Sequence, residues 1–172
     1  AKAAFVKAAE LTRASDGLVA LTLSDAFCVD RHRESFRHLV DNHVDILFAN
    51  ESELLSLYEE SDFEVALENL TKGRKIYCIT RSEKGSVILA AGIRHDIPAA
   101  PVDNIVDTTG AGDQYAAGVL AGYIKGLSWP DAGFLGSRCA AEVISHYGAR
   151  PETTLDFQGV SRAKPLTTLY EN

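Results

Sequence analysis

The sequence predicts an α/β domain built around a mostly parallel β-sheet. Two observations carry this prediction. Short, continuous apolar runs such as "KIYCIT" (75–80) are typical of strands that a parallel sheet buries on both faces. These runs alternate with segments of helical periodicity and are joined by short turns, which is the order expected of parallel strands linked by helices.

In the first half of the chain, helices and strands alternate. Apolar residues at helical spacing predict a helix over 1–15, and a β-rich run predicts a strand over 18–23. The same two patterns predict further helices and strands, in chain order: a helix over 31–40, a strand over 44–48, helices over 51–58 and 63–72, and a strand over 75–80.

The second half begins with a predicted β-hairpin, 86–91 and 93–97, because Gly92 separates two strand-like runs. A helix follows the "TGAGD" turn and is expected to run to about Lys125. Ser128 resembles an N-cap with Pro130 in the first turn, so another helix should open there and run towards His146. Gly148 is expected to end that helix.

Composition excludes several classes of function. The chain has 172 residues, 46% of them hydrophobic, with 24 acidic and 17 basic residues and a net charge of -7. A nucleic-acid or membrane-surface protein normally needs a basic face, so neither partner is expected. There is no membrane-length apolar run and no signal segment, which predicts a cytoplasmic protein.

The three cysteines predict neither a disulfide framework nor a zinc site. Cys28, Cys78 and Cys139 are odd in number and widely spaced, so we expect reduced, buried thiols. Cys28 and His32 lie close in sequence, but no second pair follows at ligand spacing. The chain also has no methionine and begins at Ala1 within a helical pattern, which is compatible with a fragment, a processed product or a recoded sequence and favours a fragment.

The segment "VDTTGAGDQYAAGVLAGYIKG" (106–126) is the strongest candidate for chemistry. The first turn of a helix has N–H groups without intrahelical partners, at the positive end of the helix dipole. Gly110, Ala111 and Gly112 add almost no side-chain bulk there, so an anion can approach closely. Asp113 places a carboxylate beside it. An anion hole next to a proton acceptor suits phosphoryl transfer.

The turn alone supports a plainer interpretation equally well: a tight turn, with Asp113 merely favouring the helix dipole. Two competing motifs are absent. The chain has no G-x-x-x-x-G-K-[ST] loop, and Tyr115 stands where G-x-G-x-x-G needs its third glycine.

"DTTGAGD" (107–113) resembles the C-terminal signature of the ribokinase/PfkB family of sugar and nucleoside kinases. Other stretches agree in order with that family. They are "ANESE" (49–53), "ITRSEKGS" (79–86) and "AAEVISHYGARP" (140–151), while "LTLSDAFCVDRHR" (21–33) is similar to adenosine-kinase-like members. The resemblance implies a Rossmann-type three-layer fold, of which 1–151 would be the C-terminal, nucleotide-binding part and 152–172 an irregular tail. The family's N-terminal half, with its β lid and most acceptor contacts, would be missing.

The resemblance also implies roles for individual residues. Asp113 would be the catalytic base, and Gly110, Ala111 and Gly112 would form the anion hole. The residues implied to bind ATP and its ions are Asn50 and Glu53 (Mg²⁺ and phosphate, through water), Thr80, Ser82 and Gly85 (phosphates or ribose), Ala141 and Ile144 (adenine), and Asp107 and Thr109 with the turn near Gly148 (a monovalent cation, K⁺).

Some of these assignments have ordinary structural alternatives. Asn50 and Glu53 by themselves favour a capped helix start, and Thr80 to Ser82 an ordinary exit from a strand. Ser137 stands where ribokinases often have Asn, which puts one adenine contact in doubt. The small residues 117, 118, 121 and 122 are expected to let their helix lie close to the sheet.

Together the motifs predict an ATP-dependent kinase acting on a hydroxyl of a nucleoside, with adenosine the first choice of acceptor and a sugar the second. Two alternatives stay open: a non-catalytic nucleotide-binding or dimerising homologue, and an inactive half-domain. A homodimer of the full-length protein is compatible with the family, whose dimers use the lid. The acceptor and the oligomeric state are not fixed by the sequence.

Overall fold

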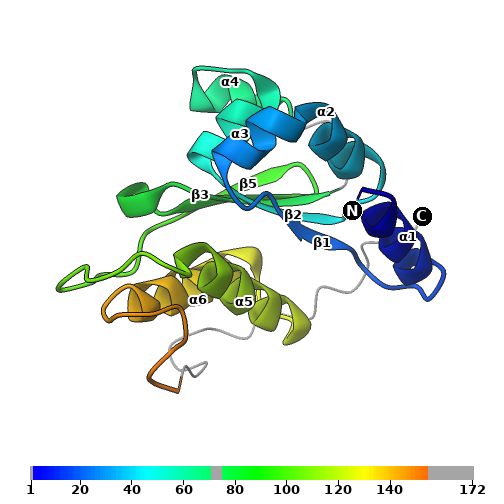
Figure 1. Ribbon diagram of the computed structural model, residues 1–172. Coiled ribbons are helices and arrows are strands. Elements are labelled where there is room, and N and C mark those ends of the chain that lie inside the picture. Colours follow the sequence, from blue (N-terminus) through cyan, green and yellow to red (C-terminus); the bar gives the residue numbers. More distant parts are fainter. Residues whose placement is uncertain (1, 71–74, 155–172) are drawn as a thin grey trace. The chain divides into compact units, whose positions relative to one another are not determined.

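The computed structural model describes residues 2–70 and 75–154, which form helices and a five-stranded sheet of order β1-β2-β3-β4-β5 (Figure 1). The chain divides into two compact units. The first comprises Ala1–Ile79 with Leu89–Ile93, and the second comprises Thr80–Ile88 with Arg94–Asn172.

The first unit alternates helices with parallel strands, as the sequence predicts. Its elements are α1 (Lys2–Arg13), β1 (Ala20–Thr22), α2 (Ala26–Asn42), β2 (Ile46–Asn50), α3 (Glu51–Tyr58), α4 (Phe63–Glu68) and β3 (Ile76–Thr80), whose last residue belongs to the second unit. Strands β1 and β2 pair in parallel, with Ala20 opposite Ile46. Helical crossovers separate β1, β2 and β3, as parallel neighbours require.

Helix α2 begins earlier than predicted, at Ala26 instead of residue 31. The Asp25 carboxylate caps it by accepting the Cys28 N–H at 2.7 Å. The helix is kinked at His32, which has a φ of -127°. Helix α4 ends at Glu68, earlier than the predicted residue 72, and residues 71–72 lie outside the described residues.

A predicted hairpin extends the sheet after β3. The short 3₁₀ turn η1 (Ser82–Lys84) leads into β4 (Ser86–Ala90), and β5 (Ile93–Ile97) follows after Ala91 and Gly92. Such short connections join antiparallel neighbours, so the sheet combines a parallel part with an appended antiparallel part. Both turn residues have positive φ, 51° for Ala91 and 76° for Gly92.

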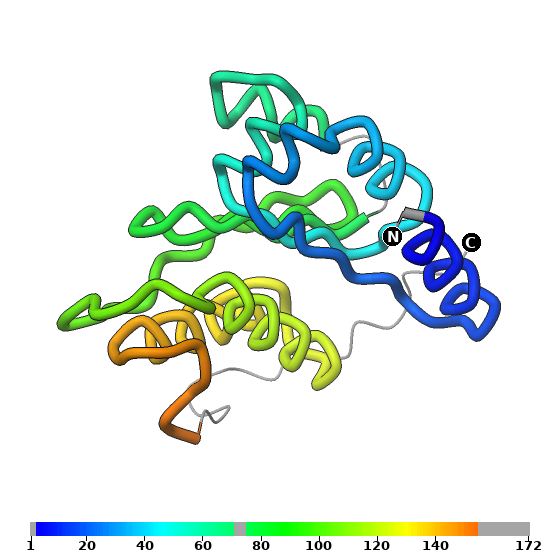
Figure 2. Tube along the Cα trace, viewed as in Figure 1, coloured from blue at the N-terminus to red at the C-terminus, as the bar shows by residue number. Residues whose placement is uncertain are grey.

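Two helices of the second unit, α5 (Ala111–Ile124) and α6 (Trp129–Val143), lie side by side (Figure 2). A Cβ on Gly118 would lie 2.7 Å from the Gly136 Cα, and a Cβ on Gly122 2.8 Å from the Ala132 Cα. These glycines therefore permit close approach to α6. The expectation that they serve contact with the sheet was wrong, because helical periodicity cannot tell which neighbour a small face meets.

The start of α6 confirms the predicted cap. The Ser128 hydroxyl accepts the Asp131 N–H at 3.2 Å and donates to the Asp131 carboxylate at 2.6 Å. The predicted end at Gly148 was wrong: α6 ends at Val143 with Ile144 as C-cap. The Ile144 carbonyl instead accepts the Val106 N–H at 2.8 Å. Most of the predicted tail, from residue 155, lies outside the described residues.

All three cysteines are free thiols. Cys78 and Cys139 are buried, as expected, whereas Cys28 is only half-buried. Of the helices in the described part of the chain, none has both the length and the apolar character that crossing a membrane requires.

Candidate active site

The glycine turn before α5 contains two glycines with different surroundings. Gly110 adopts a left-handed conformation, with a φ of 82°, and a Cβ there would lie 2.6 Å from the Cβ of Ala149. Only glycine fits such a position. A Cβ on Gly112 would meet nothing within 4 Å, so this residue faces open space.

The N–H groups of the turn are divided between internal bonds and open positions. The Ala111 N–H donates to the Thr108 carbonyl at 3.2 Å, and the Gln114 N–H to the Gly110 carbonyl at 2.9 Å. Within the described residues, no acceptor contacts the N–H of Gly112 or of Asp113. The turn thus engages the N–H of Ala111, which was predicted to belong to the anion hole. It leaves the N–H groups of Gly112, also predicted, and of Asp113 available.

Asp113 lies in the first turn of α5, and its side chain is exposed. No hydrogen-bond donor contacts its carboxylate among the residues that the structure describes. The side chain is therefore neither buried in the apolar interior nor committed to capping the helix. A carboxylate in this position is available to accept a proton.

Asp107 fixes the loop that leads into the turn. One carboxylate oxygen accepts the Thr109 N–H at 2.9 Å, and the other accepts the Gly148 N–H at 3.1 Å. The Thr109 side chain and N–H, followed by the Gly148 N–H, lower the pKa of Asp107. The structure thus brings together Asp107, Thr109 and Gly148, the residues predicted to surround a monovalent cation.

In the first unit, Asn50 and Glu53 form a complete capping box at the start of α3. The Asn50 side-chain oxygen accepts the Glu53 N–H at 2.8 Å. In return, the Glu53 carboxylate accepts the Asn50 N–H at 2.9 Å and its side-chain amide at 2.8 Å. Glu53 is buried, at 5% exposure, and burial raises its pKa despite the Asn50 N–H. Because Asn50 engages both carboxylate oxygens, any role with Mg²⁺ suits water-mediated contact better than direct ligation.

No group of three or more His, Cys, Asp or Glu side chains in the described ranges is arranged to hold a metal ion by itself.

The predicted nucleotide loop follows β3. Gly85 is buried and has a φ of 83°. A Cβ there would lie 2.0 Å from the Ile97 carbonyl oxygen, so packing requires glycine at this position. The Arg81 N–H donates to the Gly85 carbonyl at 2.7 Å and closes the loop. Ser82 is exposed at its tip, and Thr80 is half-buried at the end of the strand.

A buried hydrogen bond joins this loop region to α5. The Tyr115 hydroxyl and the Ser86 hydroxyl are 2.8 Å apart, and the two residues are 3% and 2% exposed.

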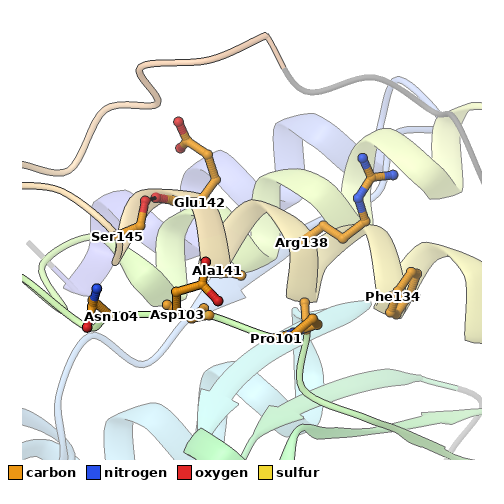
Figure 3. Close-up of a pocket in the computed structure, with 10 residues that line it drawn as sticks. Pro101, Asp103, Asn104, Phe134, Arg138, Ala141, Glu142 and Ser145 are labelled. Carbon is orange, nitrogen blue, oxygen red and sulfur yellow. Dashed lines mark hydrogen bonds between the residues drawn. The ribbon is translucent and has the colours of Figure 1, made fainter.

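An open pocket of about 650 Å³ lies between the loop 100–104 and the segment from Phe134 to Ser145, which is α6 and the residues just after it (Figure 3). Its lining residues are Ala100, Pro101, Val102, Asp103, Asn104, Phe134, Arg138, Ala141, Glu142 and Ser145. Ala141, predicted to touch adenine, is among them. Ile144 is not, and its carbonyl anchors the loop at 106–107 instead.

Sequence reasoning missed most of this pocket. The α6 residues that line it, from Phe134 to Glu142, recur at helical spacing, so one helix face carries them, and Ser145 follows just after the helix. That stripe mixes apolar, charged and small side chains, which hid it from a search for apolar periodicity. Ser137 is buried, at 7% exposure, and does not line the pocket.

Glu142 holds the segment that follows α6. One of its carboxylate oxygens accepts the Glu152 and Thr153 N–H groups, each at 2.9 Å, and the Thr153 hydroxyl at 3.1 Å. Burial opposes ionisation of Glu142, but these hydrogen bonds outweigh it and lower the pKa. The other oxygen lies 3.5 Å from the His146 Nε2.

The chain is similar to known proteins in sequence and in structure. The family model for pfkB carbohydrate kinases matches residues 1–155. Two solved structures superpose on 88% of this chain with 44% identity and a TM-score of 0.85: a probable sugar kinase from Rhizobium etli, of which the chain covers 46%, and adenosine kinase from Sinorhizobium meliloti, of which it covers 47%. Cytidine kinase from Thermococcus kodakarensis is 37% identical over 121 residues, which are 69% of this chain and 43% of that protein.

The chain spans less than half the length of the relatives it is compared with here. The family match nevertheless covers all the described residues. The chain belongs to the pfkB family of carbohydrate kinases.

Proposed function

We propose that the full-length protein is an ATP-dependent phosphotransferase that moves the γ-phosphoryl group to a hydroxyl of a nucleoside or sugar. The observation that carries this proposal is the start of α5. There, two N–H groups without acceptors in the described chain adjoin open space at Gly112 and the exposed carboxylate of Asp113.

In the proposed reaction, Asp113 accepts the proton of the attacking hydroxyl as the oxygen–phosphorus bond forms. The bond from phosphorus to the bridging oxygen of ATP breaks, and ADP leaves with its electron pair. The N–H groups of Gly112 and Asp113 donate to the oxygens of the migrating group. They add to the positive end of the α5 dipole, which favours the negative charge there.

We assign the nucleotide to the second unit. The open pocket beside Ala141 has a size suited to a base, and Thr80, Ser82 and Gly85 would line the phosphates or ribose. Mg²⁺ would supply charge neutralisation on the phosphates, with Asn50 and Glu53 organising it through water. Asp107 and Thr109, with the Gly148 turn, would hold a monovalent cation of the K⁺ type and so steady the loop before the glycine turn.

Adenosine is the first choice of acceptor, and a furanose or hexose sugar is the second. The similarity to adenosine kinase from S. meliloti and to cytidine kinase from T. kodakarensis supports a nucleoside. The equal similarity to a sugar kinase from R. etli supports the second choice.

Replacing Asp113 by Asn in the full-length protein tests the proposal. ADP release would be measured with adenosine, ribose and fructose as acceptors. We expect turnover to fall about a thousandfold while ATP binding is nearly unchanged, because the amide cannot take the proton. Asp131→Asn is the matched control, since Asp131 occupies the same position in the first turn of α6.

Two results would count against the proposal. An Asp113→Asn variant that keeps most of its turnover would remove Asp113 as the base. A full-length wild type that binds ATP but releases no ADP with any of the acceptors would favour a non-catalytic nucleotide-binding protein.

A further inference from the structure

Residues 148–153, here called the strap, run from the glycine turn to the end of α6. At its beginning, the Gly148 N–H donates to Asp107, and Gln114 of α5 donates its side-chain amide to the Ala149 carbonyl at 3.2 Å. The Cβ of Ala149 lies where a Cβ on Gly110 would collide with it. The strap therefore packs directly on the turn that precedes Asp113.

Glu142 fastens the other end of the strap. A single carboxylate oxygen accepts three hydrogen bonds, two from N–H groups and one from the Thr153 hydroxyl. Charge-assisted hydrogen bonds of this kind are about twice as strong as neutral ones. The Glu142 side chain is itself only 12% exposed.

Glu142 also lines the open pocket, yet its carboxylate turns away from it. Figure 3 shows the carboxylate directed away from Asp103 and Ala141. Its carboxylate contacts the strap residues Glu152 and Thr153 and lies near His146, and none of these three residues lines the pocket. The charged group of Glu142 thus bonds to the strap.

We propose that Glu142 is a positioning residue for phosphoryl transfer. By holding the strap on α6, it keeps Ala149 pressed against Gly110 and so fixes the glycine turn beside Asp113. This inference rests on the proposed function, since the turn is there assigned to the migrating phosphoryl group. Small displacements of an oriented donor can cost a large factor in rate, so a loosened strap should slow the chemical step.

The test uses the full-length protein with changes on both sides of the contact. Glu142→Ala removes the acceptor. Thr153→Pro removes the N–H and the hydroxyl that Thr153 donates and leaves Glu142 in place. Glu142→Gln keeps an acceptor oxygen and is the conservative variant. Glu152→Ala is the matched control, because it removes a carboxylate from the strap but keeps the N–H that bonds to Glu142.

We expect Glu142→Ala and Thr153→Pro each to lower kcat about tenfold, with KM for ATP changed by less than about twofold. Combining the two changes should add little, since both break the same contact. Glu142→Gln should recover most of the turnover, and Glu152→Ala should match the wild type. A different result would overturn the inference: an unchanged kcat, a higher KM for ATP and an altered preference between ATP and GTP. It would mean that Glu142 contacts the nucleobase of ATP.

Hydrogen exchange separates this inference from the proposed function. The Ala111 and Gln114 amides bond within the turn, so they should exchange faster in Glu142→Ala and Thr153→Pro but not in Glu152→Ala. Unchanged exchange at both amides in both variants would refute the strap's effect on the turn, whatever the kinetics. A wild type without kinase turnover would refute the proposed function, and exchange would still decide the role of the strap.

Discussion

Gly110 and Ala149 contact each other so closely that a Cβ on Gly110 would lie 2.6 Å from the Cβ of Ala149. The two residues are distant in sequence, but the contact joins the glycine turn to the segment after α6. The other glycine of the turn, Gly112, has open space where its Cβ would be. The same motif therefore contains one glycine required by packing and another that keeps a surface clear.

Gly110→Ala should destabilise the protein. The left-handed conformation costs a residue with a Cβ about 1–2 kcal/mol, and the collision with Ala149 adds to this. Urea unfolding would measure the loss. Adding Ala149→Gly should recover the part due to the collision with the Ala149 Cβ. It should not recover the part due to the backbone conformation or to the Ala149 Cα, which would lie 2.9 Å from the new Cβ. Equal stability of the single and double variants would show that the collision relaxes without cost.

Gly112→Ala, unlike Gly110→Ala, should leave the protein stable but lower its turnover. A Cβ meets no atom there, and alanine favours the helix over glycine by about 1 kcal/mol, so the unfolding free energy should stay level or rise. Turnover should nevertheless fall about tenfold or more, because the methyl group occupies the space proposed for the phosphoryl oxygens. A stable variant with full turnover would place the anion elsewhere.

Tyr115→Phe should cost about 1 kcal/mol of unfolding free energy, since it removes a hydrogen bond between two buried hydroxyls. Ser86→Ala removes the same bond from the other side. A double-mutant cycle by denaturant unfolding should show a double variant less destabilised than the sum of the two single ones. Strict additivity would indicate that the contact contributes nothing.

Glu53→Gln should change how stability depends on pH. Burial raises the folded-state pKa of Glu53, so the folded protein holds this proton more tightly than the unfolded chain does. The tighter binding of this proton stabilises the folded state fully below the ordinary pKa of 4.5. This stabilisation is lost as pH rises through the raised pKa of the folded state. Glutamine does not titrate, so the stability of Glu53→Gln relative to wild type should grow with pH over that window.

Unfolding in urea without Mg²⁺ at several pH values would measure this difference. Glu64→Gln, on the exposed first turn of α4, controls for the loss of a surface charge. A difference between wild type and Glu53→Gln that stays constant with pH would contradict the prediction.

The sequence predicted those features that depend on neighbouring residues. Helix α3 was predicted with its correct bounds, because Asn50 and Glu53 form a local capping box. The start of α6 at Ser128 and the hairpin around Gly92 were confirmed for the same reason. The family was also confirmed, and the motif at 107–113 that pointed to it is contiguous in the chain.

Features that depend on distant contacts were missed. The end of α6 is set by contacts with the loop before α5, which accounts for the error at Gly148. The fastening of the strap by Glu142 and the packing of Ala149 on Gly110 likewise link segments that no local pattern relates. The early start of α2 was different, since Asp25 offered a local capping signal that periodicity alone overlooked.

Gly118 and Gly136 leave α5 and α6 no room for even a methyl group between their backbones. Neither helix can roll against the other without a steric clash, so the pair should move as a single rigid body. Any adjustment that accompanies catalysis must then come from the loops at its ends. Directed evolution of acceptor range would accordingly gain more from those loops than from substitutions along the interhelical seam.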